Sequence, residues 1–175
     1  MYKFGKSEDP ILKAIRFAQE KHRGQVRKFS GKPYFIHPDK VAKLVYKYTK
    51  SPFLQVAAYL HDTLEDTNTT YQEIQKEFST KIADVVTELT SIEKEKKKLG
   101  KHIYLARKMN KMSSDALTIK LCDRLDNISD KSSLEFRKKY KKETEYIINN
   151  LKRPLNGIQK RILKDIKKVL EKMVP

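Results

Sequence analysis

Apolar residues recur every three or four positions along most of the chain, which is the spacing of one face of an α-helix. An N-capping aspartate and a first-turn proline at Asp9-Pro10 predict a helix that runs to about His22. Pro38 and the pair Ser51-Pro52 open two further segments with the same periodicity. A fourth helix is expected at Thr70-Tyr71-Gln72-Glu73, because this segment has the form of a capping box.

The second half of the chain continues this helical pattern. A helix is expected from about Thr80, and a strongly apolar helix from Ser114. Two basic amphipathic helices follow at roughly 134–151 and 155–173. Residues 91–111 are rich in lysine and poor in apolar residues. We expect a solvated face there, with closure over a polyphosphate as the alternative.

Alternation between apolar and polar residues, which is typical of strands, does not extend over a useful length anywhere in the sequence. The stretch 24–38 holds two glycines and two prolines, and it is predicted to be a loop with at most a very short β-hairpin near 26–36. We therefore predict an all-α fold, with a single domain over residues 1–175 and about eight to nine helices.

The chain is strongly basic, with a formal net charge of +17 from 39 Lys and Arg against 22 Asp and Glu. Three explanations stay open: binding of nucleic acid, electrostatic steering of a polyanionic small substrate, and a general lysine bias without function. Lysines greatly outnumber arginines, and the sequence has no Arg-rich or Gly-aromatic cluster. Nucleic acid is therefore the weakest of the three explanations.

Cysteine content and hydropathy limit the cellular setting. The single cysteine, Cys122, cannot form an intrachain disulfide, which suits a reducing compartment. No segment approaches the roughly 20 apolar residues that a membrane span needs, and residues 1–6 have no apolar stretch long enough for a signal peptide. The sequence therefore predicts a soluble cytoplasmic protein that does not bind membranes.

Two imidazoles and two carboxylates lie on three separated stretches: His37, the doublet His61-Asp62, and Asp123. The doublet can face one ion only if its helix ends there, and the turn residues that follow favour such an ending. Asp123 lies in an otherwise apolar helix, where a carboxylate is costly to bury unless it is paired or binds a metal. Taken singly, His37 could cap a helix, and Asp123 could pair with Arg124 or Arg27. A mixed imidazole–carboxylate site suits Mn²⁺, Fe²⁺ or Zn²⁺.

Four motif segments surround these residues: His22-Arg23-Gly24-Gln25-Val26-Arg27-Lys28, Gly31-Lys32-Pro33-Tyr34-Phe35-Ile36-His37-Pro38, Ala57-Ala58-Tyr59-Leu60-His61-Asp62-Thr63-Leu64-Glu65-Asp66-Thr67 and Ile119-Lys120-Leu121-Cys122-Asp123-Arg124-Leu125-Asp126-Asn127. In their order and spacing they resemble the hydrolase domain of RelA/SpoT homologues, which are HD-domain phosphohydrolases. The resemblance covers roughly residues 8–130. The short length makes the chain similar to the stand-alone small alarmone hydrolases, including the metazoan type.

This resemblance implies an all-α fold that removes the 3′-pyrophosphate from the alarmone (p)ppGpp, giving GDP or GTP and pyrophosphate. The metal is usually Mn²⁺, and another divalent ion is possible. By position, the resemblance implies a metal-binding role for His37, His61, Asp62 and Asp123. It implies that Glu65 and Asp66 activate or orient the attacking water. It also implies that Arg27 and Lys28 lie near the base and phosphates, and that Asn127 lies near the ribose and phosphate. Without the resemblance, the acidic pair could be an exposed helix end and the basic pair a solvated loop.

The chain departs from the family pattern in two places. Asp126 stands where many bacterial members have histidine, and we expect little effect because it lies outside the ligand set. Ile128-Ser129 replaces a Met-Arg or Leu-Arg pair, which leaves the preference for guanine open. Two other functions therefore stay in view. One is an HD phosphohydrolase acting on ppApp, NADPH or a simple nucleotide, and the other is a basic nucleic-acid-binding module with a degenerate metal site.

Overall fold

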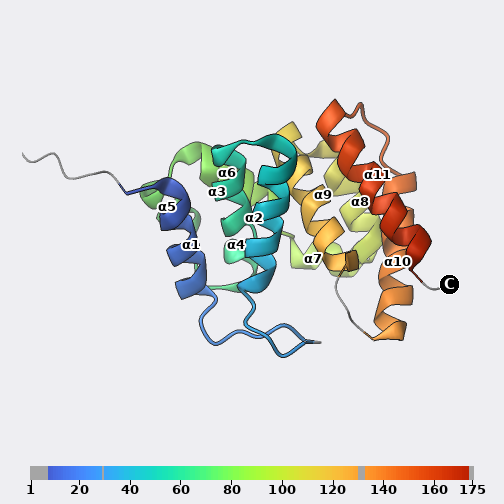
Figure 1. Cartoon of the computed structure of the whole chain (residues 1–175), viewed down its shortest axis with the longest axis horizontal. Coiled ribbons are helices and arrows are strands. Elements are labelled where there is room, and N and C mark those ends of the chain that lie inside the picture. Colours follow the sequence, from blue (N-terminus) through green and yellow to red (C-terminus); the bar gives the residue numbers. More distant parts are fainter. Residues whose placement is uncertain (1–7, 29, 130–132, 174–175) are drawn as a thin grey trace, which may run out of the picture.

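The computed structural model describes residues 8–28, 30–129 and 133–173, and its regular structure is helical (Figure 1). The helices are α1 (Pro10–Lys21), α2 (Ile36–Thr49), α3 (Pro52–Leu60), α4 (Thr63–Asp66), α5 (Tyr71–Glu77), α6 (Thr80–Leu89), α7 (Glu93–Leu99), α8 (Lys101–Lys111), α9 (Ser114–Ser129), α10 (Leu134–Asn149) and α11 (Gly157–Lys172). The predicted all-α fold is confirmed.

The described residues form eleven helices rather than eight or nine, and the extra ones have local causes. Helix α4 is a single four-residue turn directly after the His61-Asp62 doublet. The Lys-rich stretch divides into α7 and α8 at Gly100, whose φ of 81° is a conformation that favours glycine. Of β-structure, the described residues contain one isolated antiparallel bridge, between Val26 and Pro33.

Capping side chains set the helix starts that the sequence predicts. The Asp9 carboxylate accepts a hydrogen bond from the N–H of Ile11 at 2.8 Å, at the start of α1. Helix α2, however, begins at Ile36, two residues before the predicted start at Pro38. Proline is tolerated there because N–H groups of a first turn have no partner inside the helix. His37 consequently lies within the first turn of α2.

Helix α9 is the central element of the core. It packs against α2, α6, α10 and α11, and Figure 1 shows it between α2 and α11. Its buried apolar residues are Ala116, Leu117, Ile119, Leu121, Leu125 and Ile128. It also buries Asp123, Arg124 and Asp126, so charged side chains reach the middle of the molecule. Cys122 is a free, buried cysteine, and burial raises the pKa of its thiol.

Among the residues that the structure describes, no helix combines the length and the apolar character that crossing a membrane requires.

Candidate metal centre

Three side chains from three helices converge on one buried point. His37 comes from the first turn of α2, His61 is the C-cap of α3, and Asp123 comes from the middle of α9. Each offers a ligand atom, and these atoms all lie within 4.8 Å of one another. All three residues are buried. The structure therefore brings together three of the four predicted metal ligands in a group that could hold an ion.

Asp62, the fourth predicted ligand, lies beside this group. Its Oδ2 atom is 3.1 Å from Nε2 of His61 and 3.6 Å from Nε2 of His37. Helix α3 ends at Leu60, and Asp62 is the N-cap of α4, so the chain turns between the two ligands. This break in the helix lets two consecutive side chains face the same point, as the sequence required.

Hydrogen bonds fix the orientation of both imidazoles. Nδ1 of His37 lies 2.7 Å from Oδ2 of Asp126, and Nδ1 of His61 lies 2.8 Å from the carbonyl oxygen of Ala58. With Nδ1–H donating to each oxygen, both Nε2 atoms face the carboxylates of Asp62 and Asp123. The buried Nε2 of His61 has no hydrogen-bond partner. A lone pair that is buried and unpartnered, beside two carboxylates, fits a divalent cation.

Burial, charge and hydrogen bonds within the cluster shift the pKa values of its side chains. Burial lowers the pKa of His37, but hydrogen bonds to Asp123 and Asp126 outweigh it and raise the pKa to about 9. Burial raises the pKa of Asp62, whereas the charge of His61 holds it well below its ordinary value. Burial also raises the pKa of Asp123. The charge of the Lys120 ammonium and the hydrogen bond from His37 outweigh burial, so the pKa of Asp123 lies well below its ordinary value. The centre therefore favours ionised carboxylates, which are the form that binds metal.

The predicted acidic pair lies at the edge of this centre, in α4. Asp66 accepts a hydrogen bond from the hydroxyl of Tyr34 at 2.9 Å, and the same hydroxyl donates to Asp62 at 2.7 Å. Burial, followed by the charge of Asp62, raises the pKa of Asp66. Glu65 accepts from the N–H of Ser91 at 2.8 Å and contacts Nζ of Lys96 at 3.3 Å. Both carboxylates line a pocket that opens over the centre.

An open pocket of about 280 Å³ lies over the predicted metal ligands His37, Asp62 and Asp123. Its remaining lining residues are Arg27, Lys28, Tyr34, Glu65, Asp66, Ser91, Lys96, Lys101, Leu105, Lys120, Arg124, Asn127, Phe136 and Tyr140. The three predicted substrate-binding residues are therefore all in its wall. Asn127 also donates to Oδ1 of Asp123 at 2.5 Å, so it contacts a predicted metal ligand as well.

Sequence reasoning assigned no site role to Tyr34, Lys120, Arg124 or Asp126, of which the first three line the pocket and Asp126 contacts His37 beside it. The last three lie in α9, where the argument that singled out Asp123 applies equally, since a charged side chain in an apolar helix needs a partner. Nζ of Lys120 lies 2.9 Å from Oδ2 of Asp123, so this carboxylate pairs with a lysine that the sequence argument did not consider. Tyr34 gave no signal beyond its place in a motif segment.

Two departures from the family pattern have to be reassessed. Asp126 was expected to have little effect, yet it is buried, accepts a hydrogen bond from His37, and lies 3.4 Å from Nη1 of Arg27. Ser129 was expected to affect the nucleotide contacts, but its hydroxyl donates to the carbonyl of Leu125 and it lines a groove between α2 and α11. The first residue belongs to the site, and the second lies outside the pocket wall.

The Lys-rich stretch 91–111 divides between the two roles considered for it. Lys96 and Lys101 line the pocket. Lys108 donates to the carbonyl of Thr90, which fixes the stretch to the end of α6. The other lysines of the stretch, Lys94, Lys97, Lys98 and Lys111, are exposed.

Comparison with known proteins agrees with this geometry. A family model described as the HD domain matches residues 14–158. A guanosine-3′,5′-bis(diphosphate) 3′-pyrophosphohydrolase of Aquifex aeolicus is 40% identical over 140 residues, which are 78% of this chain. The chain spans only a part of that bacterial relative, because the match covers 20% of the relative's length.

A relative of similar size occurs in an animal. The guanosine-3′,5′-bis(diphosphate) 3′-pyrophosphohydrolase MESH1 of Xenopus tropicalis is 40% identical over 124 residues, covering 69% of this chain and 68% of the frog protein. A solved structure of a metazoan SpoT orthologue superimposes with a TM-score of 0.78 over 94% of this chain and 97% of the other. At 24% identity, that structure shows a shared fold.

Proposed function

Since this chain belongs to the HD-domain family and, within it, to the RelA/SpoT homologues, we propose that it removes the 3′-pyrophosphate of (p)ppGpp, giving GDP or GTP and pyrophosphate. The observation that carries the proposal is the convergence of two imidazoles and two carboxylates at the floor of a basic pocket. The activity for which the bacterial and frog relatives are named supports this substrate. We propose that residues 1–175 act as one catalytic domain.

His37, His61, Asp62 and Asp123 would hold a divalent cation, for which we propose Mn²⁺. The donor set of imidazole nitrogen and carboxylate oxygen suits this ion, as it also suits Fe²⁺ or Zn²⁺. When bound, such a cation polarises a phosphoryl oxygen and lowers the pKa of a coordinated water.

The reaction needs a group that takes a proton from the attacking water. The oxygen of water forms a bond to the phosphorus next to the 3′-oxygen, the bond from that phosphorus to the 3′-oxygen breaks, and the 3′-oxygen leaves as a hydroxyl after gaining a proton. Glu65 would receive the proton of the water, once Lys96 exchanges its contact with Glu65 for one with a phosphate; its position in the pocket wall supports this role. Asp66 would orient the water or supply a proton, and its raised pKa supports this role.

Basic side chains on two walls of the pocket suit a substrate with two diphosphates. Arg27 and Lys28 come from the loop before α2, whereas Lys96, Lys101 and Lys120 come from α7, α8 and α9. Charge-assisted hydrogen bonds from such groups neutralise phosphate oxygens. The stacked rings of Phe136 and Tyr140, with centroids 5.0 Å apart, offer an apolar surface to the nucleoside.

We propose that the protein works in the cytoplasm. The single cysteine is buried and unpaired, which suits a reducing compartment.

A purified-protein assay with ppGpp and Mn²⁺ tests the function directly, by following release of GDP and pyrophosphate. Release should be lost on chelation and in Asp62→Ala, which removes a proposed ligand. Glu65→Ala should keep metal binding and lose turnover by roughly 10²–10⁴-fold, the usual contribution of a general base. Full activity of Asp62→Ala would overturn the ligand assignment.

A substrate panel of ppApp, NADPH and simple nucleotides separates the second candidate function from the first. Metal-dependent hydrolysis of one of these without action on ppGpp would move the proposal to another nucleotide. A protein that hydrolyses none of them and binds DNA or RNA with a steep salt dependence would support the nucleic-acid-binding alternative.

A further inference from the structure

Asp126 lies where the metal centre meets the outer wall of the pocket. It belongs to α9, three residues after Asp123, and only 6% of its surface is exposed. Its Oδ2 atom lies 2.7 Å from Nδ1 of His37 and 3.4 Å from Nη1 of Arg27. Its other oxygen is 4.0 Å from Nζ of Lys40. One carboxylate oxygen thus contacts both a proposed metal ligand and a proposed substrate-binding residue.

We propose that Asp126 is a positioning residue that joins the metal-binding side of the site to the nucleotide-binding side. It directs Nε2 of His37 toward the metal centre, and it holds Arg27 at the pocket wall. This inference rests on the function proposed above, and it assigns a role to a position at which the chain departs from its family's pattern.

The effect on His37 follows from the chemistry of imidazole. A neutral imidazole carries one N–H, and the carboxylate of Asp126 fixes that hydrogen on Nδ1, which leaves the lone pair of Nε2 for the cation. A carboxylate partner also makes the imidazole a stronger ligand than a neutral partner does. His61 differs in this respect, because its Nδ1 faces the backbone carbonyl of Ala58. Of the two imidazoles, only His37 is therefore oriented by a side chain that a substitution can change.

The effect on Arg27 follows from its place in the chain. Arg27 lies in the loop between α1 and α2, whose described residues hold one isolated β-bridge and no helix. Its ion pair with Asp126 connects this loop to the central helix of the core, and the side chain of Arg27 is only 14% exposed. The guanidinium is consequently held in the wall of the pocket, where a nucleotide would meet it.

Titration of the metal-free protein with Mn²⁺ tests the first half of the proposal, without any hydrolysis. Asp126→Asn keeps the shape of the side chain and removes its charge, so we expect about tenfold weaker binding. Asp126→Ala removes the hydrogen bond as well, so we expect up to about a hundredfold. Asp165→Asn is the matched control, since this carboxylate lies on α11 in the groove that Asp126 also lines and binds the hydroxyl of Tyr48. Its Mn²⁺ affinity should equal that of the wild type.

Steady-state kinetics test the second half. At Mn²⁺ concentrations that saturate each variant, Asp126→Asn should recover kcat while its KM for ppGpp stays several-fold raised, because Arg27 loses its ion pair with the Asp126 carboxylate. A purely structural role for Asp126 would lower the folded fraction instead, which helical circular dichroism of the metal-free variants detects.

The outcomes separate this inference from the proposed function. Wild-type protein that binds no Mn²⁺ would overturn the metal centre and this inference with it. Wild-type protein that binds Mn²⁺, together with folded Asp126→Asn and Asp126→Ala that bind it within twofold as well, would overturn the role of Asp126 alone.

Discussion

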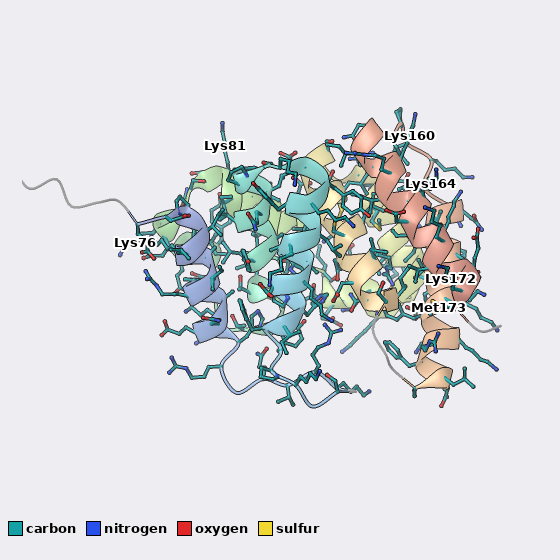
Figure 2. The ribbon with its side chains drawn as sticks, viewed as in Figure 1. Lys76, Lys81, Lys160, Lys164, Lys172 and Met173 are labelled. Carbon is teal, nitrogen blue, oxygen red and sulfur yellow. The ribbon has the colours of Figure 1, made fainter. Side chains whose placement is uncertain are left out.

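Helices α9 and α11 each have sixteen residues and pack against each other, but they carry their charges differently. Helix α9 buries Asp123, Arg124 and Asp126 in the middle of the molecule. In α11 the buried residues are Gln159, Ile162, Ile166 and Leu170, and none of them is charged. Figure 2 shows Lys160, Lys164 and Lys172 along α11, and all three are exposed.

Burial of a charged side chain, more than the number of charges, indicates function in these two helices. A buried charge costs free energy unless a partner stabilises it, so charges persist in α9 where they serve a site. A solvated lysine costs little and is therefore compatible with many sequences. The six Lys and Arg residues of α11 are all exposed and so are of the second kind, whereas lysines from α7, α8 and α9 line the pocket.

The largest effect is expected from removing a buried carboxylate of α9. Asp123→Ala deletes a proposed metal ligand and leaves Lys120 and Asn127 without their partner. Hydrolysis of ppGpp should fall by about ten thousandfold, which corresponds to 5–6 kcal/mol of transition-state stabilisation. The initial rate in saturating Mn²⁺ measures it, and the activity of Asp165→Asn is the control on α11. A loss below tenfold would contradict the role of Asp123.

A large loss of stability is expected from the apolar side of α9. Leu117 is fully buried, so Leu117→Ala should lower the free energy of unfolding by about 2–5 kcal/mol through lost burial and a cavity. On α11, Leu163 is only half-buried, and Leu163→Ala should cost less than half as much. Urea denaturation of both variants measures the contrast. Equal losses would show that α9 is not the centre of the core.

The third effect concerns pH and the imidazole that faces α9. His37 has a raised pKa of about 9 in the folded, metal-free protein, against an ordinary value near 6.5. Its contribution to stability is therefore complete below pH 6.5 and is lost as the pH rises to 9. In chelator, the melting temperature should fall over this range more steeply for the wild type than for His37→Gln. Parallel curves for the two proteins would contradict the raised pKa.

The smallest effect is expected on the exposed face of α11. Lys164→Ala removes a solvated charge, so the free energy of unfolding should change by no more than about 0.5 kcal/mol. Hydrolysis of ppGpp should be unchanged, because Lys164 does not line the pocket. Chemical denaturation and the standard assay check both values. A marked loss of activity would show that charge on α11 does contribute to substrate capture.

Local signals predicted most of the fold, and long-range contacts explain what was missed. Asp9 and Ser51 cap the helices that the sequence assigned to them, because capping involves residues only two or three positions apart. The contact of His37 with Asp126 joins residues 89 positions apart, and no periodicity reports such a pair. The one-turn helix after Asp62 was also missed, since four residues are too few to show a pattern.

The proposed metal ligands stood out for a different reason. Asp123 conflicts with its apolar surroundings, and the His61-Asp62 doublet, which is common on its own, gained weight from its order with His37 and Asp123 and from the family resemblance. Tyr34 does not conflict with the residue types around it, so the sequence does not single it out. Its hydrogen bonds to Asp62 and Asp66 form only when the loop before α2 folds against α4. Residues that obey local rules while serving a site are the ones that sequence reasoning overlooks.

The buried thiol of Cys122 is a natural probe for transient opening of the core. It precedes Asp123 directly, its side chain is closed to solvent, and its raised pKa keeps it in the unreactive thiol form. A thiol-alkylating reagent can therefore react only when the core around α9 opens. The alkylation rate thus measures how often that opening occurs, and a cation bound at the neighbouring carboxylate should slow the reaction before any substrate is added.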